Sequence, residues 1–100
     1  MKKLSKEQIQ KLFNYFQKEN YEHVIRECRK LLKKYPNSSA LYNLLGLSLQ
    51  QIKNFDDAKN SYLKAIELDP KNQAVLNNLG SIFRAMEDFD KAKKYLIEVL

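Results

Sequence analysis

Few residues of this 100-residue chain could do catalytic chemistry, and none of them lies at catalytic spacing. His23 is the only histidine and Cys28 is the only cysteine. A lone imidazole with no Cys or His partner at ligand spacing does not hold a metal. One histidine and two glycines also cannot supply a Ser-His-Asp set or a glycine-rich phosphate loop. Cys28 stands in an apolar helical pattern, which predicts a structural thiol. We therefore expect no enzyme activity, no metal and no cofactor.

Basic side chains form the next candidate for a site. The net charge is +6, and the excess falls in residues 1–36, where ten Lys and Arg face four acids. One helical face collects Arg26, Arg29, Lys30 and Lys33, with Lys34 beside it. These cations could bind RNA or an anionic surface, but no aromatic side chains interleave with them for base stacking. A solvated helix face is the simpler interpretation, so nucleic acid is an unlikely partner.

The composition bounds the class of protein. A hydrophobic content of 44% suits a folded chain, and two Gly and two Pro are too few for the turns of an all-β fold. No apolar run approaches the ~18 residues that a membrane span needs. The N-terminal stretch is polar, unlike a signal peptide, and a single cysteine fits a reducing compartment. These features predict one small cytoplasmic domain.

Apolar spacing predicts six helices that must position any site, over residues 5–18, 21–35, 39–53, 55–68, 73–86 and 89–100. Pro36 and Pro70 end the second and fourth of them. Ser5 with Gln8 predicts a capping box, and Asn37 or Ser38 should cap the third helix. The short turns make consecutive helices antiparallel. We expect the third helix to bury Leu41, Tyr42, Leu45, Leu49 and Ile52.

The chain repeats itself after 34 residues. YNLLG at 42–46 returns as LNNLG at 76–80, and NFDDA at 54–58 returns as DFDKA at 88–92. Such a period is typical of stacked helical repeats. Leu12, Gly46 and Gly80 share one slot, where a small residue should let the two helices of a pair approach closely.

These residues resemble the tetratricopeptide repeat (TPR) family, whose pattern is W-x2-L-G-x2-Y, then A-x3-F, A and P. The second repeat carries it most fully, and the first is degenerate, with Gln8 and Lys11 in apolar slots. The resemblance implies an all-α solenoid of three antiparallel helix pairs in a right-handed superhelix. The repeats span about 5–38, 39–72 and 73–100, the last incomplete. The matching residues of the second repeat are Tyr42, Leu45, Gly46, Leu49, Ala58, Tyr62, Ala65 and Pro70.

The resemblance further implies that the first helix of each pair lines a concave groove. The groove slots are rich in amides, which can bond a peptide backbone whatever its side chains are. The Lys/Asn/Lys/Arg clamp that some relatives use for carboxylate tails is absent, since its slots hold Ile9, Phe13, Leu44, Ala74 and Asn78. We therefore expect no tight binding of such tails. The predicted groove residues are Lys6, Gln10, Phe13, Gln17, Asn43, Leu47, Gln50, Asn77, Asn78, Ser81 and Arg84.

We interpret the chain as a non-catalytic scaffold that binds a protein or an extended peptide. One alternative is the substrate-recruiting segment of a larger glycosyl- or sulfotransferase. The other alternative is an RNA or anionic-surface binder. The apolar end, YLIEVL, predicts either a piece of a longer array, which we favour, or self-association through the last helix.

Overall fold

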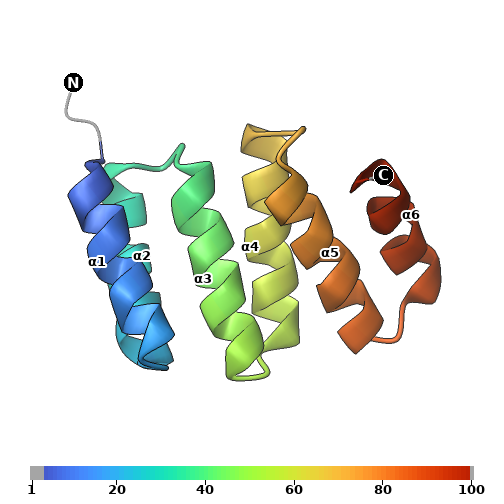
Figure 1. Ribbon diagram of the computed structural model, residues 1–100, viewed down its shortest axis with the longest axis horizontal. Helices are drawn as coiled ribbons and strands as arrows, with labels where there is room; N and C mark the ends of the chain where they lie inside the picture. The colour runs from blue at the N-terminus through green and yellow to red at the C-terminus, as the bar shows by residue number, and fades with distance from the viewer. Residues whose placement is uncertain (1–3, 100) are drawn as a thin grey trace.

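Six α-helices make up the computed structural model, which describes residues 4–99. Figure 1 shows them side by side as a row of three antiparallel hairpins, with the two ends of the chain at opposite ends of the row. Their number and order confirm the all-α prediction, and no strand occurs in the described range. The helices are α1 (Lys6–Gln17), α2 (Tyr21–Lys34), α3 (Ser39–Gln51), α4 (Phe55–Leu68), α5 (Gln73–Ala85) and α6 (Phe89–Val99).

The first helices of the three pairs form one layer of the molecule. α1 contacts α3 and α3 contacts α5, whereas α2 does not reach α4 within residues 4–99. The second helices instead pack against the next pair, α2 on α3 and α4 on α5. Within the described part of the chain, contacts between successive pairs within one layer therefore occur only among the first helices, α1 with α3 and α3 with α5. The inner face of the row is the side that these three helices form.

The turn inside each pair contains a residue with left-handed backbone. Glu19, Lys53 and Glu87 have φ of 61°, 67° and 62°, and they lie 34 residues apart. After α3, the Lys53 amide donates to the Gln50 carbonyl at 3.0 Å and the Asn54 amide donates to the Leu49 carbonyl at 2.9 Å. This pair of bonds is a Schellman motif, which satisfies the last carbonyls of a helix.

These motifs correct three predicted boundaries. α1, α3 and α5 end at Gln17, Gln51 and Ala85, one or two residues before the predicted ends. The usual sequence mark of this motif is glycine, and here Glu and Lys take its place. No glycine therefore marked the last residue of α1, α3 or α5 in the sequence.

Between pairs, proline and a capping side chain set the turn. Pro36 and Pro70 follow the ends of α2 and α4. The Ser38 hydroxyl then accepts from the Leu41 amide, and the Asn72 amide oxygen accepts from the Val75 amide, each at 3.2 Å. The capping box at Ser5 is also confirmed. Capping fixes where α1, α3 and α5 begin, and hence their register on the inner face.

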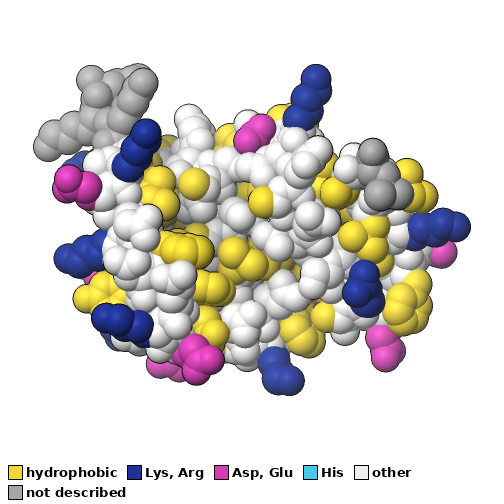
Figure 2. All heavy atoms as spheres, in the orientation of Figure 1, with side chains coloured by type: hydrophobic (Ala, Val, Ile, Leu, Met, Phe, Trp, Pro, Cys, Tyr) yellow, Lys and Arg dark blue, Asp and Glu magenta, His cyan; other side chains and the backbone are white. Residues whose placement is uncertain are grey.

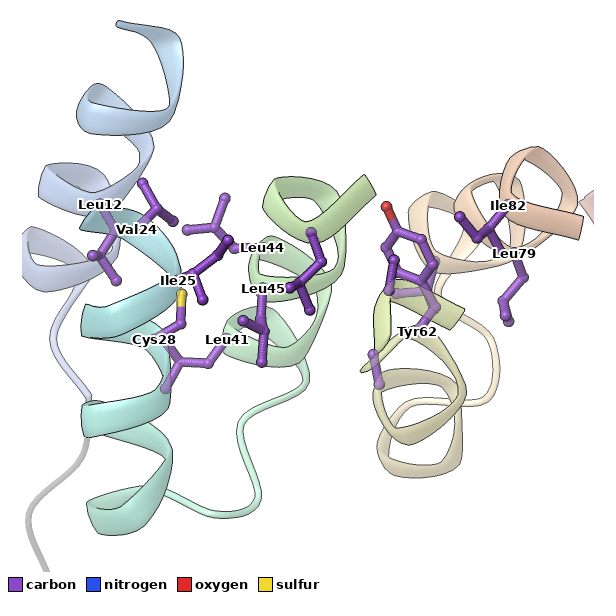
Figure 3. Packing of buried hydrophobic residues seen from close by; sticks show 14 of the residues in the cluster. Leu12, Val24, Ile25, Cys28, Leu41, Leu44, Leu45, Tyr62, Leu79 and Ile82 are labelled. Atoms are coloured by element: carbon purple, nitrogen blue, oxygen red, sulfur yellow. The ribbon is translucent and has the colours of Figure 1, made fainter. Parts of the chain in front are cut away.

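The core runs through the whole row and joins the three pairs. Figure 3 shows buried side chains from α1 to α5 in one band, including Cys28, Leu45, Tyr62 and Ile82. The prediction for Ile52 was wrong, because it caps α3 and is 44% exposed. The two glycines approach side chains rather than backbone, since a Cβ on Gly46 or Gly80 would meet Tyr62 or Leu96.

Candidate functional site

A hollow opens on the inner face between α1 and α3. Its volume is about 330 Å³. Its apolar lining comes from α1 and α3, and its polar rim comes from α3 and the α4–α5 turn. Of the predicted groove residues, it contains Phe13, Asn43 and Leu47. The complete lining is Ile9, Phe13, Ser39, Ala40, Asn43, Leu44, Leu47, Asp69 and Asn72.

Phe13 presents its ring to this hollow because Leu12 occupies the core side of the same helical turn. Leu12 is buried, whereas Phe13 is 41% exposed. The Phe13 ring stacks on Phe16 with centroids 6.2 Å apart, and Phe16 meets the edge of Tyr21 at 5.3 Å. Such contacts between rings are favourable beyond the area that they bury. They hold Phe13 in place without burying it.

Hydrogen bonds between amides join the second and third repeats on the same face. The Asn78 side chain donates to the Asn43 amide oxygen at 2.8 Å. Gln50 donates to the Ser81 hydroxyl at 3.1 Å and accepts from the Tyr62 hydroxyl at 2.8 Å. Four predicted groove residues, Asn43, Gln50, Asn78 and Ser81, therefore form hydrogen bonds between the second and third repeats. The two side-chain N–H groups of Asn43 and the side-chain oxygen of Asn78 have no hydrogen-bond partner among the described residues.

The centre of the inner face carries no charge. Figure 2 shows hydrophobic and uncharged side chains there, with Lys, Arg, Asp and Glu at the edges. Asp69 is the one charged residue among those that line the hollow. The apolar lining of the hollow consists of Ile9, Phe13, Ala40, Leu44 and Leu47. A carboxylate placed here would lose hydration and gain no cation, which is unfavourable.

The remaining predicted residues do not join this hollow. Asn77 and Arg84 line a second hollow, beside α6. Lys6, Gln10 and Gln17 are exposed on α1, where Gln10 bonds to Asn14 at 3.0 Å. The eleven predicted residues therefore do not all line one hollow.

Sequence reasoning also missed part of the hollow. Asp69 and Asn72 belong to the turn between α4 and α5, which no pattern of first-helix slots includes. Their positions beside Pro70 marked a turn. The sequence held no signal that this turn would fold back to the edge of the α1–α3 hollow.

The other candidate groups lie away from the inner face. The five cations of α2, from Arg26 to Lys34, are exposed on the outer layer. His23 rests against the Tyr15 ring with centroids 4.3 Å apart. Burial, together with the Glu27 carboxylate, raises the pKa of the Cys28 thiol from 9.0 to about 12. A buried neutral thiol is a poor nucleophile, so Cys28 acts as a core residue.

None of the helices in the described range is long and apolar enough to cross a membrane.

Comparisons with known proteins agree with this architecture. Residues 6–98 match the sequence profile of a family described as "Psidin, N-terminal TPR repeats region". No curated protein matches the chain in sequence. The fold is similar to the second TPR of Spaghetti (RPAP3) bound to the HSP90 peptide SRMEEVD. That match has a TM-score of 0.86 and 17% identity, and it covers 90% of this chain and 83% of the other.

Two further solved structures are similar. MamA from Desulfovibrio magneticus RS-1 matches with a TM-score of 0.86 and 20% identity over 90% of this chain. This chain spans 51% of the length of that solved chain. The TPR2B domain of yeast Sti1, in complex with pHsp70, has a TM-score of 0.84 and 20% identity, over 88% of this chain and 70% of the other. At these identities the matches establish the fold.

Proposed function

Because this chain belongs to the tetratricopeptide repeat family, we propose that it is a non-catalytic scaffold that binds an extended peptide on its inner face. The observation that carries the proposal is the hollow between α1 and α3. It combines an apolar lining with the free N–H donors of Asn43, beside the free amide oxygen of Asn78. Such a site can hold one apolar side chain while its amides bond the peptide backbone.

The hollow favours a peptide that differs from those bound to the similar structures. The RPAP3 domain holds the acidic peptide SRMEEVD, whereas Asp69 is the single charge that lines the hollow in this chain. An acidic tail would meet an apolar surface and a carboxylate. We therefore propose that the ligand contributes a neutral apolar side chain to the hollow.

Selection from a library of displayed 12-residue peptides tests the proposal. The chain should enrich peptides that share an apolar residue, and Phe13→Asp should lose them because it places a charge in the hollow. Ile52→Asp is the matched control, since Ile52 is similarly exposed and lies outside the hollow. The SRMEEVD peptide should not bind measurably. Enrichment that survives Phe13→Asp would disprove the assignment.

The other interpretations stay predictions. If the chain is the substrate-recruiting segment of a larger transferase, it would bind the substrate through the same hollow. The longer protein would then add the catalytic domain. Binding of RNA to the exposed cations of α2 would fall steeply as salt rises. The cytoplasmic location expected from the sequence also stays a prediction.

A further inference from the structure

The hollow between α1 and α3 has an acidic edge beside the first turn of α3. Asp69 and Asn72 line this edge from the α4–α5 turn, and Ser39 lines it from the start of α3. Figure 1 shows the α4–α5 turn on the same side of the row as the first residues of α1 and α3, at the top of the view. Farther along these two helices the lining is apolar, with Phe13 and Leu47. A bound ligand therefore meets different chemistry at the two ends of the hollow.

The polar groups at the acidic edge are left mostly with hydrogen-bond acceptors. The Ser39 hydroxyl donates to the Ala65 carbonyl at 3.0 Å, so its oxygen can still accept. The Asn72 side chain donates to Asp69 Oδ2 at 3.2 Å, and its own oxygen accepts from the Val75 amide. The Asp69 Oδ1 atom has no partner among the described residues. Such an edge favours a ligand group that donates hydrogen bonds and carries a positive charge.

The Asp69 carboxylate is held in place but has no cationic partner. The Asp69 amide donates to the Ala65 carbonyl at 3.0 Å, and the Asn72 amide donates to the Asp69 carbonyl at 3.1 Å. Neither of the ion pairs found among the described residues includes Asp69. It is also the one charged residue that lines the hollow. A cation on the ligand would therefore pair with it without competition from the lining.

We propose that the peptide bound in this hollow carries Lys or Arg two residues before or after its apolar residue, and that this basic side chain pairs with Asp69. This specificity rests on the proposed function, because it concerns the ligand of the same hollow. Side chains two residues apart in an extended chain point the same way and lie about 7 Å apart. Ser39 at the acidic edge and Leu44 in the apolar part are about 7.5 Å apart along the axis of α3. The two spacings match.

The exposure of Asp69 sets the size of the expected effect. Its carboxylate is exposed to solvent, and ion pairs between exposed groups change an affinity by a factor of about five at most. Most of the affinity therefore comes from the apolar residue in the hollow. The basic residue decides which apolar peptides bind, because charge complementarity acts mainly on specificity.

Sequencing of the selected 12-residue peptides tests the proposal. Among peptides bound by the wild type, Lys or Arg at this spacing should be about threefold more frequent than in the unselected library. Asp69→Asn should keep the apolar residue and lose the basic one, because the amide can still accept from Asn72 but has no charge. Asp69→Lys should select Asp or Glu instead. Asp56→Lys is the matched control, since Asp56 is also exposed and lies outside the hollow, and it should select as the wild type does.

Calorimetry with one enriched peptide measures the pairing directly. Neutralising its basic residue, Arg as citrulline or Lys as acetyl-lysine, should weaken binding to the wild type about three- to fivefold. The same change should leave binding to Asp69→Asn unaltered, and its effect on the wild type should shrink as NaCl rises. Circular dichroism checks that each variant is folded.

The outcomes separate this specificity from the proposed function. An apolar preference without a basic one, or a basic preference that Asp69→Asn retains, overturns the pairing with Asp69 and leaves peptide binding in the hollow intact. A wild-type selection that enriches no shared apolar residue overturns both.

Discussion

Gly46 and Gly80 occupy equivalent slots, but different side chains face them. A Cβ on Gly46 would lie 2.5 Å from the Tyr62 ring, which is buried and bonded to Gln50. A Cβ on Gly80 would lie 2.6 Å from Leu96, which is half-buried and has rotatable bonds. In the first pair the larger side chain lies on the first helix instead of the second. Leu12 stands in the slot of the two glycines, and the smaller Cys28 stands in the slot of Tyr62.

This contrast predicts different costs for the same substitution. Alanine gains about 1 kcal/mol over glycine in a helix, and overpacking costs about 1–3 kcal/mol where the neighbour cannot move. Gly46→Ala should therefore lower the free energy of unfolding, whereas Gly80→Ala should leave it nearly unchanged because Leu96 can rotate away. Urea unfolding of both variants measures the difference. Equal effects would show that Tyr62 moves as freely as Leu96.

The buried thiol of Cys28 makes stability depend on pH. Its pKa is about 12 in the folded chain and near 9.0 when exposed, so the unfolded state ionises first as pH rises. The buried neutral thiol makes its full contribution to the free energy of unfolding below pH 9, and this contribution is lost progressively toward pH 12. Between pH 7 and pH 9.5 the loss should be about 1 kcal/mol.

Urea unfolding at these two pH values, with Cys28→Ala as the control, measures this effect. The variant should be less stable at both pH values, because it leaves a small cavity. When the pH rises from 7 to 9.5, the free energy of unfolding of Cys28→Ala should nevertheless fall less than that of the wild type. A wild-type chain and a variant with the same pH dependence would contradict the assigned burial of the thiol.

At the scale of elements, three Schellman motifs end α1, α3 and α5 with Glu19, Lys53 and Glu87 in left-handed backbone. A side chain in this conformation costs about 1 kcal/mol, and glycine avoids that cost. Lys53→Gly should therefore raise the free energy of unfolding by roughly 0.5–1 kcal/mol. Lys59→Gly, within α4, is the control and should lower it. Thermal unfolding measures both, and destabilisation by Lys53→Gly would contradict the assigned backbone conformation.

At the scale of the whole molecule, the two ends of the row differ. The last pair presents an apolar surface, whereas α1 places Glu7 and Lys11 where α3 and α5 bury Leu41, Leu45, Val75 and Leu79. Burying these polar side chains would make head-to-tail stacking of two copies unfavourable. An interface between two different surfaces would not close and would grow into open assemblies.

This asymmetry predicts how to make the protein polymerise. Glu7→Leu together with Lys11→Leu should give α1 an apolar stripe like those of α3 and α5, which can pack on the exposed apolar surface of α6. Sedimentation should then show assemblies that grow with concentration. Glu7→Gln with Lys11→Gln removes the same charges without adding the stripe, and it should not polymerise. Absence of assemblies in the leucine variant would show that the stripe is insufficient for docking.

The sequence by itself determined the helices, their order and their repetition. Apolar residues three and four apart, Pro36 and Pro70, and the returning YNLLG and NFDDA patterns are local signals that a chain carries without folding. The resemblance to the TPR family added the expectation that Phe13, Asn43 and Leu47 lie on one face. The expectation that a carboxylate clamp is absent rests on the same resemblance, because the clamp depends on residue types at slots that the family defines.

Only the tertiary structure decided which of these residues meet. Whether Asn78 reaches Asn43, or Arg84 turns to the α6 side, depends on how one helix pair sits on the next, a long-range relation that residue spacing does not encode. The same packing brings Asp69 and Asn72 from a distant turn to the hollow.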